Sequence, residues 1–349
     1  MDLKEIIKQV TPPFIMSSYK KARHKDLLSS KEMLYEYQKC IQQREGLALT
    51  DVEKLSEDIP ACYLSSISTD IDEPNFYGGY QVLRDYAGLN HLLLPPRNIT
   101  IQHGYVFEIL SWEKEKLEKI NFVWSKAVLD MFKQYTSNDN IFSIGAPFFY
   151  ANSILDKDTI ISEKKRLGKN LLAFPMHSSH NVDTNYDPHT FINILKEERK
   201  HFDTVRVCLY WKDLLRGEAD IYLKSGFECV SCGHIFDINF LKRQKALFEI
   251  CDASISNGVG SHIGYSIFMK KPHKLIDDIY SFVDKQGHDG AELAEVHRKK
   301  NFLGVKKAFL DNQDYIITPE QIKCVDKFWG ISDIKTPSEI RDLLLTIVR

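Results

Sequence analysis

Residues 256–261 read Ser-Asn-Gly-Val-Gly-Ser and form the stretch of this chain best suited to bind an anion. They follow a short apolar segment, 253–255, and precede a helical pattern marked by Ile263, Ile267 and Phe268. Glycines let the backbone approach a ligand, and the first N–H groups and the dipole of a helix favour negative charge. The spacing matches neither GxGxxG nor the Walker pattern, so a tight structural connection is the alternative. The candidate binding residues here are Ser256, Asn257, Gly258, Gly260, Ser261 and His262.

Three further predicted strands, 171–174, 204–209 and 227–231, also end in polar loops. Imidazoles and hydroxyls suit phosphate oxygens or sugar hydroxyls, and an aromatic pair followed by lysine suits a base and a phosphate. The carboxyl ends of parallel strands meet at one crevice, so we expect one shared site; strand ends that are merely polar are the alternative. The candidate residues are His177, Ser178 and Ser179, then Tyr210, Trp211 and Lys212, then Gly233 and His234.

Two short motifs have metal-ligand spacing. Cys229 and Cys232 form a CxxC without a second pair, and seven irregularly spaced cysteines favour reduced thiols over a disulfide framework. His177, His180 and Asp183 recur every three residues, but a proline-led loop would not hold them on one face and no fourth ligand is evident. We therefore expect no metal and no bound cofactor.

Short strands and helices also alternate in the first half of the chain. Such alternation predicts a parallel sheet. His103 and Gly104 come at the end of the first of these strands, where a doubly wound sheet places functional groups. Residues 70–79 hold three acids and a Gly-Gly pair, which we interpret as a loop at the edge of a cleft. The predicted strands are 98–102, 120–124 and 141–147, with a helix over 126–135.

The order of these segments resembles that of GT-B glycosyltransferases. The likeness extends in particular to CDP-glycerol glycerophosphotransferases and related capsule or lipopolysaccharide transferases. It rests on the His103-Gly104 turn, a strand ending in Ser125, a Gly-Ala-Pro turn at 145–147, and the tip at 256–258. The Asp-Tyr-Ser-Ser signature of the glycerophosphotransferases is absent, which favours a nucleotide sugar over CDP-glycerol as the donor.

The resemblance implies an α/β fold with two Rossmann-like doubly wound domains that face a central cleft. It implies a metal-independent transferase that moves a sugar from a nucleotide-sugar donor to a cell-surface polysaccharide or lipid-linked glycan, as in capsule, O-antigen or lipooligosaccharide synthesis. The donor's diphosphate or phosphate would lie on the backbone of residues 258–261, with the hydroxyls of Ser256 and Ser261. His103 would be the general base, and Asp72, Glu73 and Gly104 would lie on the acceptor side.

Two other functions stay open from the sequence. A UDP-sugar 2-epimerase shares this architecture and would need carboxylates at the sugar ring, for which Asp70, Asp72, Glu73 and Asp183 are candidates. A non-catalytic protein that binds a nucleotide or glycan is the second. An epimerase converts the sugar, a transferase glycosylates an acceptor, and a binding protein does neither.

The same resemblance divides the chain into three parts. We expect an acceptor-side domain over 1–160, a nucleotide-sugar-binding domain over 165–320, and helices over 321–349 that cross back to the first domain. The polar, lysine-rich stretch 163–170 is interpreted as the linker, and 275–284 as a helix.

Composition limits the partners and the compartment. A net charge of -2 argues against attraction of the whole molecule to nucleic acid. No secretory signal opens the chain and no apolar run is long enough to span a bilayer, so we expect a cytoplasmic protein. Residues 1–25 combine apolar residues on one helix face with a basic run, which predicts either a packed terminal helix or peripheral contact with the inner face of the membrane.

Overall fold

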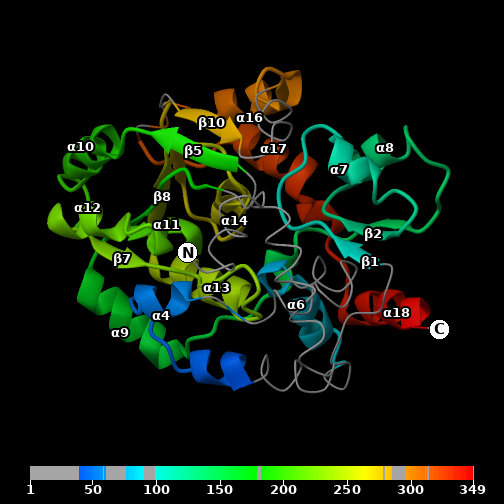
Figure 1. Cartoon of the computed structure of the whole chain (residues 1–349), viewed down its shortest axis with the longest axis horizontal. Helices are drawn as coiled ribbons and strands as arrows, with labels where there is room; N and C mark the ends of the chain where they lie inside the picture. The colour runs from blue at the N-terminus through cyan, green and yellow to red at the C-terminus, as the bar shows by residue number, and fades with distance from the viewer. Residues whose placement is uncertain are drawn as a thin grey trace, which may run out of the picture.

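The computed structural model describes residues 39–57, 59, 76–89, 99–178, 182–277, 280–284, 295–310, 312 and 314–348. Within them, five parallel strands form the larger sheet, in the order β7-β6-β4-β8-β9 (Figure 1). The predicted parallel sheet is therefore confirmed, and the fold is of the α/β class. The strands are β4 (Asn170–Phe174), β6 (Thr204–Cys208), β7 (Glu228–Val230), β8 (Ala253–Ser256) and β9 (His273–Leu275).

Helices cover both faces of this sheet. Successive side chains of a strand point to opposite faces of the sheet, and in β4 both sets of side chains over 171–174 are apolar and buried. Leu171 and Ala173 belong to one buried cluster and Leu172 and Phe174 to another. The first cluster includes side chains of α10 (Pro188–Glu198) and α12 (Ala219–Lys224), and the second includes those of α13 (Phe240–Ile250) and α14 (Ser261–Phe268).

A smaller parallel sheet has the order β1-β2-β3. The helix α8 (Lys126–Phe132) lies on one face, where Val128 packs with Val123 and Ile141. Ser125 caps this helix by accepting a hydrogen bond from the backbone N–H of Val128. The other face shares its buried cluster with α13 and α14, so the hydrophobic core continues from one sheet to the other. The strands are β1 (Ile99–Ile101), β2 (Ile120–Val123) and β3 (Ile141–Ser143).

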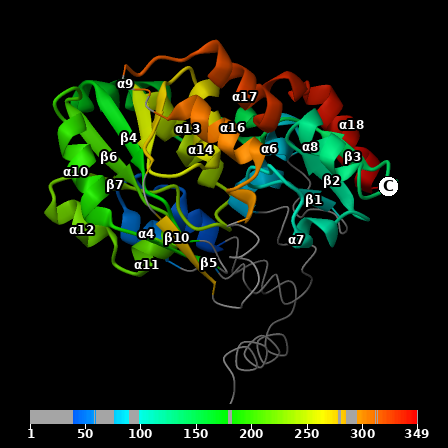
Figure 2. The ribbon, with the colours of Figure 1, turned by 90° about the horizontal axis from the view of Figure 1, so that it is seen from above.

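The C-terminal helices join the two sheets. Figure 2 shows α17 (Pro319–Trp329) and α18 (Pro337–Val348) running from the side of α14 to the smaller sheet. The contacts agree, because α17 packs against α14, α8 and α16 (Lys300–Phe309), and α18 packs against α6 (Gly79–Tyr86). Arg341 donates from Nε to the carbonyl of Ala87 at 2.8 Å, and the Tyr86 hydroxyl donates to the carbonyl of Lys335 at 3.1 Å.

Two sequence predictions of local structure are wrong. The stretch 163–170 is not a linker, because α9 (Lys157–Leu167) runs through it and leads directly into β4. Asp156 caps this helix at the backbone N–H of Thr159. The stretch 275–284 is not a helix either, because it contains the end of β9 and all of β10 (Tyr280–Asp284), which pairs antiparallel with β5 (Val182–Tyr186). Short apolar runs do not distinguish strand from helix by period alone.

Residues 39–57 pack on the larger sheet rather than on the smaller one. The helix α4 (Val52–Ser56) contacts α11 (Trp211–Leu215), and the backbone N–H of Ser231 donates to the carbonyl of Leu49 at 2.9 Å. The domain boundaries stay a prediction. In the part of the chain that the structure describes, no helix is both long and apolar enough to cross a membrane. Residues 1–25 lie outside the described residues.

Candidate functional site

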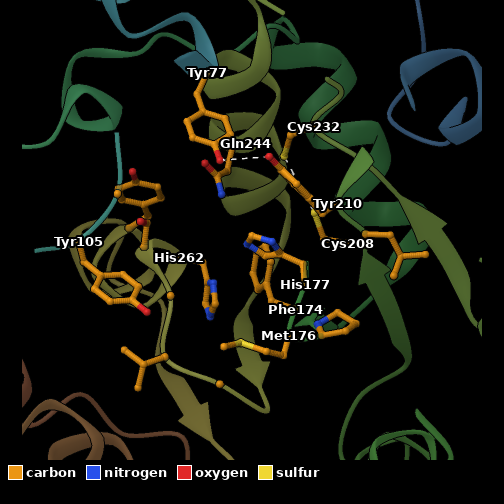
Figure 3. Close-up of a pocket in the computed structure, with 18 of the residues that line it drawn as sticks. Tyr77, Tyr105, Phe174, Met176, His177, Cys208, Tyr210, Cys232, Gln244 and His262 are labelled. Atoms are coloured by element: carbon orange, nitrogen blue, oxygen red, sulfur yellow. Dashed lines mark hydrogen bonds between the residues drawn. The ribbon is translucent and has the colours of Figure 1, made fainter. Parts of the chain in front are cut away.

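A cavity of about 280 Å³ lies where the carboxyl ends of β1, β4, β6, β7 and β8 come together (Figure 3). Convergence at this edge is what parallel strands with crossover helices produce. Its lining includes eight of the predicted site residues and several that were not predicted. The predicted ones are His103, Gly104, His177, Tyr210, Gly258, Gly260, Ser261 and His262.

His103 enters the cavity from the end of β1. Its turn is fixed by Gln102, whose side chain donates to the carbonyl of Gly104 at 2.8 Å and accepts from the backbone N–H of Trp124 at 2.7 Å. The ring of Phe76 meets the imidazole edge-on, with ring centres 4.9 Å apart. Although the imidazole is open to the cavity, loss of hydration within the surrounding protein and the charge of Lys116 together lower its pKa to about 4. His103 is therefore neutral near pH 7, the form that can accept a proton.

The loop after β4 places His177 beside Tyr210, with ring centres 4.3 Å apart. The backbone around His177 is held by two side chains. Thr184 donates from Oγ1 to the carbonyl of His177 at 2.8 Å, and Ser178 accepts at Oγ from Nη1 of Arg216 at 2.8 Å. Ser178 is buried and does not line the cavity, so its hydroxyl anchors the loop.

In the loop after β6, Tyr210 lines the cavity, whereas the two residues that follow it do not. The hydroxyl of Tyr210 lies 3.3 Å from that of Tyr77, and both rings line the cavity. Trp211 and Lys212, which begin α11, do not line it. The buried Trp211 ring packs on His234 instead, with centres 4.0 Å apart.

Gly233 and His234, after β7, also lie behind the cavity rather than in it. His234 is buried and accepts at Nδ1 from the backbone N–H of Phe236 at 3.2 Å. Beside them, Asp237 and Arg243 form a buried ion pair at 2.7 Å. These residues are therefore buried structural residues outside the described lining.

The turn after β8 is tied down from within by its first two residues. Ser256 is buried, donates from Oγ to the carbonyl of Gly258 at 2.8 Å, and lies 3.0 Å from Nε2 of His273. Asn257 accepts at Oδ1 from the backbone N–H of Met176 at 2.6 Å, which joins this turn to the loop after β4. Neither side chain lines the cavity, so the hydroxyl of Ser256 is not placed to hold an anion there.

The two glycines of this turn make room for side chains. A Cβ on Gly258 would meet the thioether of Met176, and a Cβ on Gly260 would meet the imidazole of His262. His262 stacks on Phe174, with ring centres 4.5 Å apart and the planes 7° from parallel. Its Nε2 is buried and has no hydrogen-bond partner among the described residues. Figure 3 shows this ring facing the space between Tyr105, Met176 and His177.

Several lining residues were missed by the sequence reasoning. Tyr77 lies within the stretch 70–79 that was predicted as a loop at the cleft edge, but it was not a candidate site residue. Its φ of 59° and that of 75° at Gly78 mark a sharp turn before α6. Burial raises the pKa of Tyr105 to about 12, and burial lowers that of His297 to about 4. The other missed residues are Phe174, Pro175, Met176, Thr184, Cys208, Leu209, Cys232, Phe240, Leu241, Gln244, Val259 and Tyr265.

Charge is scarce at the surface of this cavity. Among its described lining residues there is no Asp, Glu, Lys or Arg. Burial lowers the pKa of His177, and it lowers that of His262 well below its ordinary value. The lining is therefore neutral near pH 7, apart from the main-chain dipoles at the start of α14.

Some predicted residues lie outside the described residues. These are Asp70, Asp72, Glu73, Ser179 and His180; the side chain of Asp183 also lies outside the description. Across the described ranges, no three His, Cys, Asp or Glu side chains are grouped as metal ligands would be.

Comparisons with known proteins do not add a family. Neither the protein-family models nor the curated proteins give a match for this chain. The geometry and chemistry of the cavity are therefore the observations that bear on function.

Proposed function

We propose that this chain is a GT-B-like, metal-independent glycosyltransferase. It would move a sugar from a nucleotide-sugar donor to a cell-surface polysaccharide or lipid-linked glycan, as in capsule, O-antigen or lipooligosaccharide synthesis. The observation that supports this most is the cavity itself. Strand ends from both parallel sheets meet there, and the start of α14 faces the same space.

The proposed chemistry uses groups from both sheets. The acceptor hydroxyl loses its proton to the imidazole of His103 as its oxygen forms a bond to the anomeric carbon of the sugar. The bond from that carbon to the donor phosphate breaks, and the phosphate leaves with the electron pair. Main-chain N–H groups at the start of α14 stabilise the new charge. In this arrangement Tyr77 and Tyr210 contact the sugar or the base.

The epimerase is the alternative function, and it requires carboxylates at the sugar ring. Of the four candidate acids, Asp70, Asp72 and Glu73 lie outside the described residues, as does the side chain of Asp183.

The test uses candidate nucleotide sugars with glycan or lipid-linked acceptors, with products followed by mass spectrometry. We expect His103→Ala to lower transfer at least ~100-fold while the donor nucleotide binds as in the wild type. His201→Ala, at an exposed histidine outside the cavity, is the matched control and should transfer at the wild-type rate. Unchanged transfer by His103→Ala would remove its role as base, and conversion of the sugar without any acceptor would favour the epimerase.

A further inference from the structure

The described lining of the cavity contains no side chain that is positively charged near pH 7. No Lys or Arg is present in its described lining, and its histidines are neutral near pH 7. Lys116 acts on the pKa of His103 but does not line the cavity.

The positive potential that remains comes from α14. A helix of this kind presents roughly +0.5 elementary charge at its first turn, together with N–H groups that have no partner within the helix. One phosphodiester carries one negative charge, which such a terminus can stabilise. A pyrophosphate carries two, and burial of the second charge without a cation is unfavourable.

A side chain at this helix start also lacks a partner. Nε2 of His262 is buried without a hydrogen-bond partner in the described part of the chain, and the ring lines the cavity. A buried polar atom of this kind normally has a partner, and a phosphate oxygen is a suitable acceptor for a neutral imidazole N–H. The site therefore offers one imidazole and one helix terminus to one phosphate.

Cavity size points the same way. A volume of about 280 Å³ is at or below the lower end for small-molecule sites.

We propose that the donor is joined to its nucleoside through a single phosphate, as in a nucleoside-monophosphate sugar. This inference rests on the proposed function, since it specifies the donor of that reaction. The leaving group would be a nucleoside 5′-monophosphate.

The test is calorimetric titration of the full chain with CMP, UMP, GMP and AMP and with the four matching diphosphates, each with EDTA and with Mg²⁺. We expect one monophosphate to bind at least ~10-fold more tightly than the diphosphate of the same base in both buffers. A diphosphate that binds as tightly or more tightly, in either buffer, overturns the inference and leaves the proposed transferase standing. If none of the eight nucleotides binds, the proposed function fails as well.

The variant His262→Phe tests the phosphate contact. Phenylalanine keeps the ring against Phe174 and removes Nε2, so we expect monophosphate affinity to fall at least ~10-fold. His201→Gln should bind like the wild type, and circular dichroism should show that both variants are folded. A folded His262→Phe protein with wild-type affinity contradicts the role given to His262.

Discussion

At the scale of single residues, the histidines of this chain divide by environment. His273 is fully buried, with Nδ1 2.7 Å from Oγ of Ser254 and Nε2 3.0 Å from Oγ of Ser256. Burial lowers its pKa to about 3. His201 is exposed at the end of α10, where its imidazole meets water. The first is thus a structural residue beneath the β8 turn, although both have the same chemistry in the unfolded chain.

The buried His273 makes stability depend on pH. An unfolded histidine takes up a proton below about pH 6.5, whereas the folded one does so only near pH 3, so its contribution is complete above pH 6.5 and is lost as the pH falls toward 3. We expect this residue to lower the free energy of unfolding by about 2 kcal/mol at pH 5 relative to pH 7.5. Urea unfolding at the two pH values measures it.

The variants His273→Asn and His201→Gln separate this effect from the rest of the chain. His273→Asn should be less stable at pH 7.5, because Ser254 and Ser256 lose a partner, but its stability should fall less between the two pH values. His201→Gln should retain the wild-type difference. An unchanged pH difference in His273→Asn would show that this histidine is not the group that titrates.

At the scale of helices and strands, one glycine controls how α17 meets the smaller sheet. Gly330 ends α17 with a φ of 73°, in the left-handed region, and its Cα lies against the carbonyl of Trp124. A side chain there would be strained in its backbone and would collide with that carbonyl. The backbone N–H of Ala146 also donates to the carbonyl of Trp329 at 3.0 Å, so the helix end is fixed to the strand ends of β2 and β3.

We therefore expect Gly330→Ala to lower the free energy of unfolding by more than ~1 kcal/mol. Gly304 is the matched control, because it lies inside α16 and no atom lies within 4 Å of the place that an added methyl group would take. Gly304→Ala should be neutral or stabilise by about 0.5–1 kcal/mol. Thermal or urea unfolding of the two variants gives the comparison. Equal stability of the two variants would contradict the close contact at Gly330.

The same elements show what the sequence could predict. The strands β4, β6, β7 and β8 were predicted because each is a short apolar run that ends in polar residues. The helix α9 was not, because Leu167 is its one buried residue and the helix shows almost no apolar face. The strand β10 was missed because its pairing with β5 is a contact between residues far apart in sequence. Local pattern therefore predicts short apolar strands better than a helix with almost no apolar face or a strand defined by a distant partner.

The site shows the same limit at residue level. His103, His177, Tyr210 and the turn at 258–262 could be placed because each follows a predicted strand. The position of Tyr77 in the cavity depends on a contact far along the chain. Its backbone N–H donates to the carbonyl of Ile235 at 2.6 Å. A contact between residues so far apart in sequence cannot be predicted from the order of neighbouring residue types.

At the scale of the whole molecule, the two sheets share one buried core and one cavity. The core includes Trp124 of the smaller sheet's strand ends, Tyr265 of α14 and Trp329 of α17. A ligand that bridges the cavity would therefore contact both sheets at once. Binding to the folded chain alone would stabilise it by about 2.7 kcal/mol at a concentration 100 times the dissociation constant.

A nucleotide bound in this cavity should shield the thiol of Cys208 from reagents in solution, and this protection can be measured directly. This thiol lines the cavity and is partly exposed, whereas Cys40 is a partly exposed free thiol outside the lining. The rate of alkylation of each cysteine by iodoacetamide, followed by peptide mass spectrometry, is compared with and without saturating nucleotide. We expect one nucleotide to slow alkylation of Cys208 at least ~10-fold, because more than nine-tenths of the protein is bound at saturation, and to leave the rate at Cys40 unchanged. Equal rates at Cys208 with and without every nucleotide would contradict it.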